Sequence, residues 1–525
     1  QEQAAARVDA MLAGLGDAGS AAVKAKAAEL ERFQEAEDPP EKLARIPHLS
    51  RSDLSPEIDH IPRRLAETEG VPVLIHDIFT NRITYIDLAF PLDIFEPEDY
   101  RWFPLFSKMI VSMGLPDMDY GEVSSLMART LGGFYAVLEC SSPVPEARRA
   151  VNLPQGGPAE LIGRDWLIYR VKALDEKTAP GLEIAARIIL EADFTDVRRI
   201  KDILAELKND LESSLPAAGH SYASTRAGRR ISRANTLKEI WRGISQFLFI
   251  QSLTDADLGA ISGALARIRD TLASRAGLIV NLTGSGSALD RALDPIGRNF
   301  GRFGAPRPSN QRCAGAEAFH GLLGEGPGAA GQDEVYTARS LCNVGFAGMT
   351  VRAAPFSPAD QAVEKLLAHA LSTSELWEDI RMKGGAYGAF ANADIIESAF
   401  EFSTYRDPNP LRSLDAFSTA LKRMGRMPLD AAFLEKSIIG EYARETRPLS
   451  ITDKSIADFI RFLIGFEDRH RAERRKKLLA LSAEEIKAAA SRLAKENPSM
   501  VIITGAERSD RAAAALGGVR VRQLV

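Results

Sequence analysis

The sequence predicts an α+β fold of two similar domains, each a mainly antiparallel sheet flanked by helices, preceded by a helical hairpin linker. The same order of elements occurs twice: a strand pair, two helices, Gly-Gly, a second strand pair, several helices and a final strand. Gly132-Gly133-Phe134-Tyr135 has the same place in the first half as Gly384-Gly385-Ala386-Tyr387 has in the second. A stretch rich in Gly, Pro and Ala over 302–332 separates the two halves and predicts a boundary loop.

The size and composition are those of an ordinary globular protein. The chain has 525 residues, of which 45% are hydrophobic and 26% charged, and its net charge is −5. A length of this order predicts about two to four domains. The charge is small and mixed in sign, so we expect neither a nucleic-acid partner nor a membrane partner. No apolar run reaches the ~18 residues that a membrane-spanning helix needs.

The three cysteines are Cys140, Cys313 and Cys342. This sparse, odd set provides neither a disulfide framework nor a C-x-x-C metal motif, and it favours a reducing compartment. From this and the Ala- and Arg-rich composition we expect a soluble protein of the bacterial cytoplasm. Because the first residue is Gln1 and not Met, we expect a processed product or part of a longer polypeptide.

Residues 1–55 are predicted to form the helical hairpin linker. Apolar residues recur at helical spacing between charges, and the Gly-Asp-Ala-Gly-Ser sequence at 16–20 predicts a break between two helices. Glu37-Asp38-Pro39-Pro40 ends the segment, because proline blocks helix continuation. The segment has few large apolar residues, which favours a linker over a domain.

Residues 56–300 are predicted to form the first α+β domain. β-Branched and aromatic residues fill 71–79 and 83–90, and the intervening Thr80-Asn81-Arg82 favours a hairpin or strand pair. Proline and glycine positions set the predicted helix ends. The later elements are helices at 97–113 and 120–131, strands at 134–141 and 163–173, helices at 175–191, 194–213, 236–251 and 255–274, and a strand at 278–283.

Residues 301–525 are predicted to form the second α+β domain, in which the same pattern restarts after the boundary loop. The predicted elements are strands within 335–351, helices at 358–372 and 374–381, strands at 386–393 and 397–405, helices at 411–424, 429–443, 452–465, 468–479 and 482–495, and a strand at 500–504.

The sequence predicts no metal site in this chain. No two histidines have helical i, i+4 spacing, and neither H-E-x-x-H nor H-x-x-E-H occurs. Zinc needs three protein ligands that converge from rigid elements. We therefore expect the histidines to be surface or packed side chains; they are His48, His60, His76, His220, His320, His369 and His470.

The segment from Asp379 to Phe390 carries the most specific signal. Its Arg381 and Lys-Gly-Gly-Ala-Tyr-Gly, which follow Leu376-Trp377-Glu378, resemble the carboxyl-half signature of presequence proteases, zinc metallopeptidases of the pitrilysin/insulinase group. Three further stretches agree with the same family in the right order. They are Pro104-Leu105-Phe106 with Asp119-Tyr120 downstream, Gly219-His220 to Arg229, and Ser403 to Asn409. The matched segments run from about 70 to 465.

The resemblance implies an enzyme of two halves that close around a large chamber, each half with two similar α+β domains. It places 1–55 in the connecting hairpin, 56–300 in the third domain and 301–525 in the fourth. The family's amino-terminal half carries H-x-x-E-H and binds the zinc cofactor, so that half is the implied partner of this chain. The helix that bears ligands in metal-binding repeats reads Phe103 to Met109 here and contains no His or Glu.

By resemblance, Arg381 and Tyr387 bind substrate and stabilise the tetrahedral intermediate. Negative charge grows on the peptide carbonyl oxygen, and Arg and Tyr supply donors for it. Gly384 and Gly385 let the chain turn tightly into the next strand, and we assign them to substrate binding too. The alternative is that Arg381 pairs with Asp379 or Glu378 and Tyr387 is a core aromatic. For Tyr222 and Arg226, both a chamber-lining role and a bracing role at the domain interface stay open.

The function implied is that of a zinc-dependent endopeptidase that degrades unfolded peptides, with this chain supplying Arg381 and Tyr387 but not the zinc ligands. Alone, the chain is expected to be inactive. The alternative is a non-catalytic structural or peptide-binding subunit of a processing-peptidase-like complex. A free-standing peptide-binding module is a third interpretation, disfavoured because a half-chamber would expose much apolar surface.

Overall fold

The computed structural model describes residues 2–36, 38–149, 161–306, 315–325, 333–341 and 343–524. Of the predicted boundary loop 302–332, residues 307–314 and 326–332 lie outside this description, as do Cys313 and Cys342. Within it the chain forms two compact units, Gln1–Asp53 and Leu54–Val525. None of the described helices is long and apolar enough to cross a membrane.

The smaller unit is helical. Helix α1 (Glu2–Glu35) is interrupted at Gly16, whose φ of 60° and ψ of 178° are non-helical. The break falls within the predicted stretch 16–20 and has a physical cause, because only glycine adopts this backbone conformation without strain. A short helix α2 (Pro40–Leu43) and a 3₁₀ turn (Arg51–Asp53) complete the unit.

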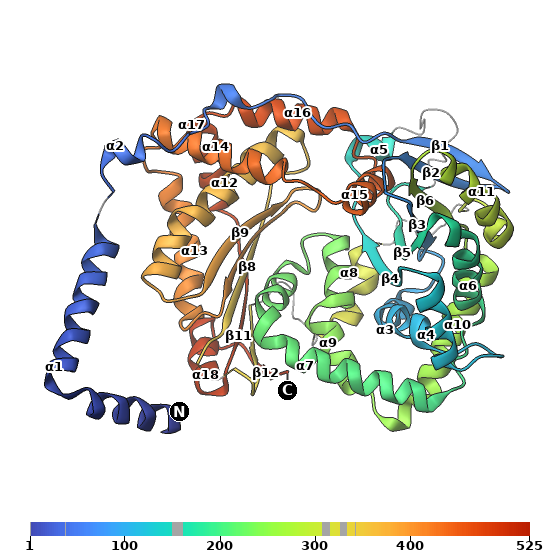
Figure 1. Ribbon diagram of the computed structural model, residues 1–525, viewed down its shortest axis with the longest axis horizontal. Coiled ribbons are helices and arrows are strands. Elements are labelled where there is room, and N and C mark those ends of the chain that lie inside the picture. Colours follow the sequence, from blue (N-terminus) through green and yellow to red (C-terminus); the bar gives the residue numbers. More distant parts are fainter. Residues whose placement is uncertain are drawn as a thin grey trace. The chain divides into compact units, whose positions relative to one another are not determined.

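The first sheet of the larger unit has six strands in the order β1-β2-β6-β3-β5-β4 (Figure 1). β2 and β6 are parallel, and the other neighbours are antiparallel. The strands are β1 (Arg64–Thr68), β2 (Val71–Asp77), β3 (Ile83–Pro91), β4 (Gly133–Cys140), β5 (Asp165–Leu174) and β6 (Ile279–Gly284).

The predicted hairpin of 71–79 with 83–90 is wrong, because β6 lies between β2 and β3. The turn signal itself is real: Asn81 and Arg82 have φ of 52° and 64°, and the Ile83 N–H donates to the Thr80 carbonyl at 3.3 Å. The two strands then diverge and admit the final strand. A turn type is set locally, whereas the neighbour of a fully buried strand is set by the whole sheet.

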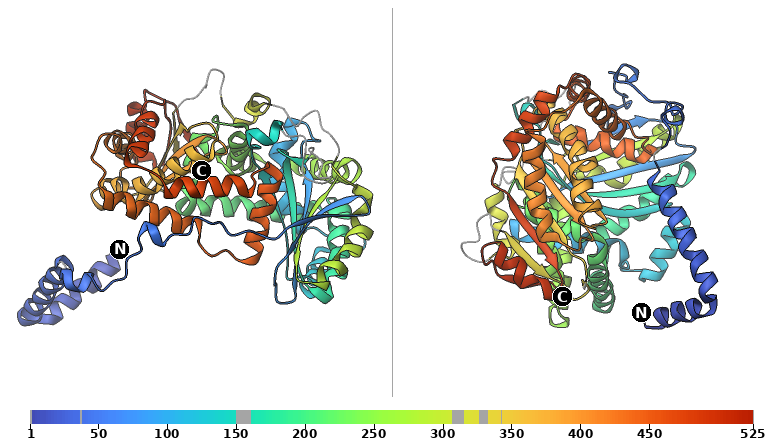
Figure 2. Two further views of the ribbon diagram at one scale, coloured as in Figure 1. Left: turned by 90° about the horizontal axis from the view of Figure 1, so that it is seen from above. Right: turned by 90° about the vertical axis from the view of Figure 1, so that its left-hand side faces the viewer.

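A layer of helices packs on one face of the first sheet, with the largest hydrophobic core between them. Figure 2 shows this layer on one side of the sheet strands. The elements after β3 are η2 (Pro97–Trp102), α3 (Phe103–Met109), η3 (Ile110–Ser112), α4 (Tyr120–Thr130), α5 (Pro145–Arg149), α6 (Thr178–Glu191), α7 (Val197–Gly228), α8 (Arg233–Arg242), α9 (Ile244–Ser252), α10 (Leu258–Arg275) and α11 (Ser287–Phe300).

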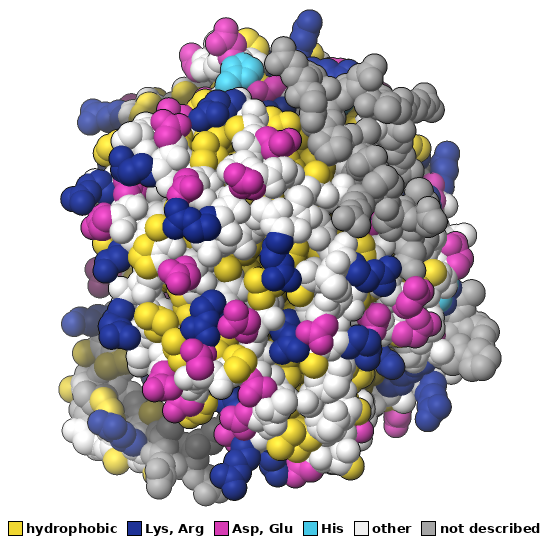
Figure 3. Space-filling view, turned by 90° about the vertical axis from the view of Figure 1, so that its right-hand side faces the viewer, with side chains coloured by type: hydrophobic (Ala, Val, Ile, Leu, Met, Phe, Trp, Pro, Cys, Tyr) yellow, Lys and Arg dark blue, Asp and Glu magenta, His cyan; other side chains and the backbone are white. Residues whose placement is uncertain are grey.

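Several helix boundaries differ from the prediction. The predicted helix 97–113 is three shorter helical segments, and 236–251 is broken at Gly243. Helix α7 does not end at 213 but continues through Pro216 to Gly228. Over α6, α10 and α11, basic and acidic side chains are interspersed on the surface, as is typical of a solvated face (Figure 3).

The second sheet has the order β12-β7-β11-β8-β10-β9. Numbered within each half, five strands of both sheets follow the order first, fifth, second, fourth, third, which confirms the predicted duplication. The sixth strand differs: β1 is antiparallel to its neighbour and β12 is parallel. The strands are β7 (Glu334–Thr337), β8 (Phe346–Arg352), β9 (Gly388–Asp394), β10 (Ala399–Tyr405), β11 (Ser499–Thr504) and β12 (Val521–Gln523).

One face of the second sheet carries its own helical layer and core. The predicted helices between 411 and 495 are all present within a few residues of their expected bounds. The helical elements are α12 (Pro358–Thr373), the π-helical segment Trp377–Met382, α13 (Pro410–Met424), α14 (Ala431–Glu445), α15 (Ile451–Ile464), α16 (Asp468–Leu479), α17 (Ala483–Leu493) and α18 (Ala506–Ala515).

Each half of the larger unit lends a helix to the other half's sheet. The carboxyl-terminal part of α7, with α9, packs on the second sheet through a core that includes Phe247 and Phe346. In return α15 packs on the first sheet through a core that includes Phe459 and Trp166. Helix α7 lies close against β8, since a Cβ on Gly348 would come within 2.5 Å of the Ala223 backbone.

Candidate functional site

A π-helical segment and two glycines form the turn that leads into β9. The Gly385 N–H donates to the Arg381 carbonyl at 3.0 Å, and the Ala386 N–H donates to the Ile380 carbonyl at 3.1 Å. Gly385 has a φ of +78°, and a Cβ on Gly384 would lie 2.5 Å from the Ile380 oxygen. Both positions therefore require glycine. A π-helical turn inside a helix is uncommon and often marks a functional site.

This turn presents Arg381 and Tyr387 on the surface of the larger unit. Tyr387 is 67% exposed, and its backbone N–H donates to the Tyr405 carbonyl at 3.1 Å, which fixes it beside β10. The Arg381 guanidinium lies 4.1 Å from the ring centroid of Trp377 and 5.8 Å from that of Tyr387. The Tyr405 ring meets Tyr387 edge-on, with centroids 5.6 Å apart. Aromatic rings thus hold the cation without neutralising it.

The carboxylates beside Arg381 are engaged by other cations. Lys383 Nζ lies 2.7 Å from a Glu378 oxygen and 3.2 Å from Asp379, and the hydrogen bond with Glu378 raises the pKa of Lys383. Arg423 pairs with Asp379 at 2.8 Å. Within the described ranges no carboxylate lies within 4.0 Å of Arg381. The alternative prediction of an Arg381 ion pair and a core Tyr387 is wrong.

Arg381 and Tyr387 line a concavity of about 730 Å³. Its floor and walls are mostly aromatic and small apolar side chains, from the carboxyl-terminal part of α7, the end of α12, the π-helical segment and the β9–β10 pair. Most of these residues carried no prediction from the sequence. The concavity is lined by Ala217, His220, Ser372, Thr373, Trp377, Arg381, Tyr387, Gly388, Ala389, Phe390 and Tyr405.

A second concavity of about 410 Å³ shares His220 and Phe390 with the first. It lies between α7 and the same two strands, and its lining is more polar. The lining residues are His220, Ser221, Ser224, Thr225, Arg242, Phe390, Asn392, Glu401 and Ser403. Burial lowers the pKa of His220, and burial followed by repulsion from Asp394 raises the pKa of Glu401.

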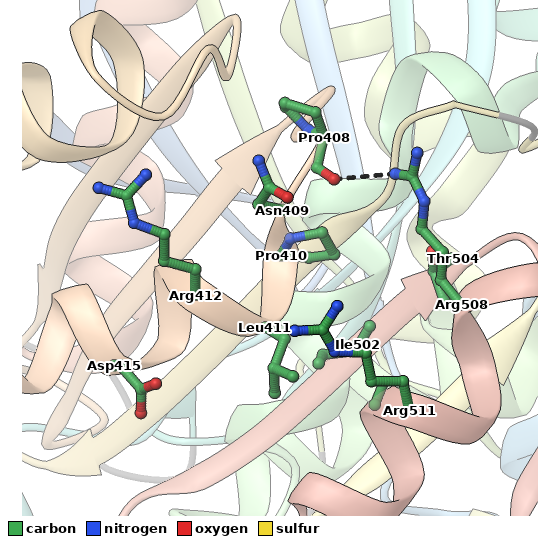
Figure 4. Close-up of a pocket in the computed structure, with 11 residues that line it drawn as sticks. Pro408, Asn409, Pro410, Leu411, Arg412, Asp415, Ile502, Thr504, Arg508 and Arg511 are labelled. Atoms are coloured by element: carbon green, nitrogen blue, oxygen red, sulfur yellow. Dashed lines mark hydrogen bonds between the residues drawn. The ribbon is translucent and has the colours of Figure 1, made fainter.

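A third cavity, of about 360 Å³, lies between the amino terminus of α13 and α18 (Figure 4). Arg508 Nη1 donates to the Pro408 carbonyl at 2.8 Å and to the Asn343 carbonyl at 2.9 Å. Pro408 in turn packs beside Gly385, since a Cβ at Gly385 would lie 3.6 Å from the proline ring. Arg508 therefore supports the loop on which the Arg381–Tyr387 turn rests.

Tyr222 and Arg226 face the interior and not a concavity. Arg226 is 1% exposed and donates to Glu334 of β7 at 2.9 Å and to Glu239 of α8 at 3.1 Å. Tyr222 is buried and packs edge-on against Phe247. Of the two roles left open for these residues, the geometry supports bracing between the first half and the second sheet.

Among the described residues, no group of three or more His, Cys, Asp or Glu side chains is arranged to hold a metal ion. In α3, Phe103, Leu105, Phe106 and Met109 are all buried in the core. His76 is fully buried, with its Nδ1 beside the Pro62 carbonyl at 3.0 Å. The donor set of the described chain does not fit a zinc ion.

Two family models match the chain. Residues 1–253 match the region described as associated with M16 peptidases of subfamily C, and residues 345–506 match "PreP C-terminal domain". Presequence protease 1 of Arabidopsis thaliana, described as chloroplastic/mitochondrial, is 27% identical over 490 residues. That match covers 92% of this chain and 43% of the relative, so the chain spans less than half of the relative's length.

Solved structures share the fold at low sequence identity. A conserved protein from Enterococcus faecalis V583 superposes with a TM-score of 0.58 at 12% identity, covering 84% of this chain and 98% of that one. A peptidase M16 inactive domain from Pseudomonas fluorescens has a TM-score of 0.54 at 14% identity, covering 85% and 98%. The chain belongs to the M16 peptidases. Within that family it corresponds to the carboxyl-terminal half of the presequence-protease-like members.

Proposed function

We propose that this chain is the carboxyl-terminal half of a zinc-dependent endopeptidase that degrades unfolded peptides, and that Arg381 and Tyr387 are its catalytic residues. One observation carries the proposal: an exposed guanidinium without a carboxylate partner among the described residues is held beside an exposed phenol at a concavity. A purely structural surface has no need for this arrangement.

Arg381 and Tyr387 supply donors to the peptide carbonyl. The guanidinium offers several N–H groups and a fixed positive charge, and the phenol offers one O–H. Both face a partly apolar concavity, where closure of the enzyme would exclude water and strengthen their interaction with the growing negative charge. Gly384 and Gly385 contribute by setting the turn that orients both side chains.

The partner in this proposal is an amino-terminal half that carries H-x-x-E-H and holds the zinc. Closure of the two halves forms a chamber that admits unfolded peptides and excludes folded proteins. This chain then has no activity alone. The relatives' names support the peptidase reaction, and the concavity beside Arg381 supports a substrate contact on this half.

The test mixes this chain with an amino-terminal half from a presequence-protease relative and follows a quenched fluorogenic peptide. We expect EDTA-sensitive cleavage by the mixture and none by this chain. Tyr387→Phe lowers kcat about 100-fold, because one donor to the transition state is lost. Tyr120→Phe, on a similarly exposed tyrosine outside the concavity, is the matched control. Cleavage by this chain unaided, or equal kcat in both variants, would contradict the proposal.

A further inference from the structure

The two concavities that share His220 and Phe390 form one groove with two different arms. One wall is the carboxyl-terminal part of α7, and the other is the β9–β10 pair. The apolar arm contains Trp377, Tyr387 and Tyr405. The polar arm runs from His220 to Arg242. The groove therefore extends well beyond the two residues proposed for catalysis.

The polar arm carries hydrogen-bonding groups that the described chain does not use. Ser224 and Thr225 on α7, and Ser403 on β10, line it without a side-chain hydrogen bond to any described residue. Asn392 reaches Glu401 only at 3.5 Å. Free donors and acceptors along both walls match an occupant that itself alternates donors and acceptors, which is the property of an extended peptide main chain.

His220 stands at the junction of the two arms. Its ring meets Tyr405 edge-on, with centroids 5.1 Å apart, and its Nδ1 is buried without a hydrogen-bond partner among the described residues. Tyr405 also contacts Tyr387. A row of rings thus connects the polar arm to the proposed catalytic tyrosine, and an occupant that reaches His220 is placed relative to Tyr387.

The outer edge of β9 does not offer a strand-pairing site at its centre. The Ala391 N–H donates to Ser372 Oγ at 2.8 Å, and Ser372 Oγ donates to the Ala391 carbonyl at 3.3 Å. Helix α12 thereby covers this edge. A peptide on this face consequently lies in the groove between α7 and the strands and does not add to the sheet.

We propose that the groove is an extended peptide subsite: the apolar arm takes one large aromatic or aliphatic side chain, and the polar arm hydrogen-bonds the adjoining main chain. This inference rests on the proposed function for the class of occupant. It adds the path of the peptide and a length requirement. Peptides long enough to fill both arms bind more tightly than short peptides that carry the same apolar residue.

The test measures fluorescence anisotropy of two fluorescein-labelled, unstructured peptides with the full 525-residue chain. One is a four-residue peptide with a single Phe; the other is a twelve-residue peptide with the same Phe between Ser, Gly and Asn. Twelve extended residues span about 40 Å, enough to occupy both arms. We expect the longer peptide to bind about tenfold more tightly, a gain of about 1.4 kcal/mol.

Two variants fill the polar arm from opposite walls: Ser224→Phe on α7 and Asn392→Trp on β9. Each is expected to bring the affinity of the longer peptide down to that of the shorter one, and to leave the shorter peptide unchanged. Ser213→Phe, at an exposed position of α7 outside the groove, is the matched control and changes neither. Thermal melts verify that each variant is folded, and two independent walls guard against loss of one variant to misfolding.

The inference is overturned if both filled variants keep the length dependence, or if the wild-type chain binds the two peptides equally. Its failure is separable from that of the proposed function. If Tyr387→Phe lowers kcat in the mixed enzyme while the length dependence survives groove filling, only the extended subsite is wrong. If groove filling abolishes the length dependence while Tyr387→Phe keeps full kcat, the subsite stands and the catalytic role is wrong.

Discussion

The duplicated halves place a tyrosine after Gly-Gly at the start of equivalent strands, with different surroundings. In the first half, Arg170 lies 5.8 Å from the ring of Tyr135, the same separation as Arg381 from Tyr387 in the second. Arg170, however, pairs with buried Asp87 at 2.8 Å and donates to Thr452 at 2.8 Å. The first arginine is a structural cation, and the second is left available.

The preceding turns differ in the same sense. In the first half, α4 ends conventionally at Thr130, and a Cβ on Gly132 or Gly133 would meet its nearest atom no closer than 3.5 Å. In the second half, the π-helical segment and two obligatory glycines raise Arg381 out of the sheet surface. A duplicated scaffold thus keeps one Tyr–Arg pair for stability and exposes the other pair for binding.

The sharpest way to break this comparison is to remove each arginine. Arg381→Gln is expected to lower kcat of the mixed enzyme by about 100-fold or more, with little change in the free energy of unfolding, because Arg381 is exposed and its loss removes charge stabilisation of the transition state. Arg170→Gln is expected to leave kcat unchanged and to reduce the free energy of unfolding by about 3 kcal/mol, because Asp87 loses its partner. Peptide kinetics and urea unfolding measure the two effects, and similar profiles for both variants would contradict the assignment.

The glycines give the next largest contrast. Gly384→Ala is expected to reduce the free energy of unfolding by about 1–3 kcal/mol and to lower kcat about tenfold, because its Cβ would collide with the Ile380 carbonyl and shift Arg381. Gly132→Ala is the control and should stay within about 0.5 kcal/mol of wild type. The measurement is urea unfolding combined with steady-state kinetics. Equal tolerance at the two sites would show that the turn does not need its present geometry.

The smallest contrast concerns pH. His76 lies in the first sheet's core, and burial lowers its pKa below that of an unfolded chain. The unfolded state therefore binds more protons, and the stability contributed by neutral His76 is present at pH 7.5 and is lost as pH falls through the unfolded pKa near 6.5. The difference in unfolding free energy between wild type and His76→Gln should thus shrink from pH 7.5 to pH 5.5. A constant difference in urea unfolding at both pH values would contradict this.

Local signals in the sequence predicted the fold class well. The Gly-Gly turns, the break near Gly16 and the helices between 411 and 495 follow from residues close in sequence, and all are present. The strand order could not be predicted locally. β6 enters between β2 and β3 from almost 200 residues away, and nothing in Thr80-Asn81-Arg82 reports it.

The candidate site was predicted in its chemistry but not in its extent. Arg381, Tyr387 and the two glycines were identified from one contiguous segment, and the structure brings them to one concavity. The groove wall made by His220 and Ser224 was missed, because α7 was expected to end at 213 when proline and glycine were taken as stop signals. Helix α7 continues through Pro216 because its far end is packed on the second sheet, and tertiary packing outweighs local propensity there.

The exchange of α7 and α15 decides how the molecule can be divided. A gene cut near residue 300 would leave Tyr336, Phe346 and Val501 without the helix that shields them, and the other fragment would lose the cover that Phe459 gives Trp166. Each piece would then display an oily sheet surface and clump with its own kind. Residues 54–525 are therefore inherited, expressed and engineered as one indivisible block.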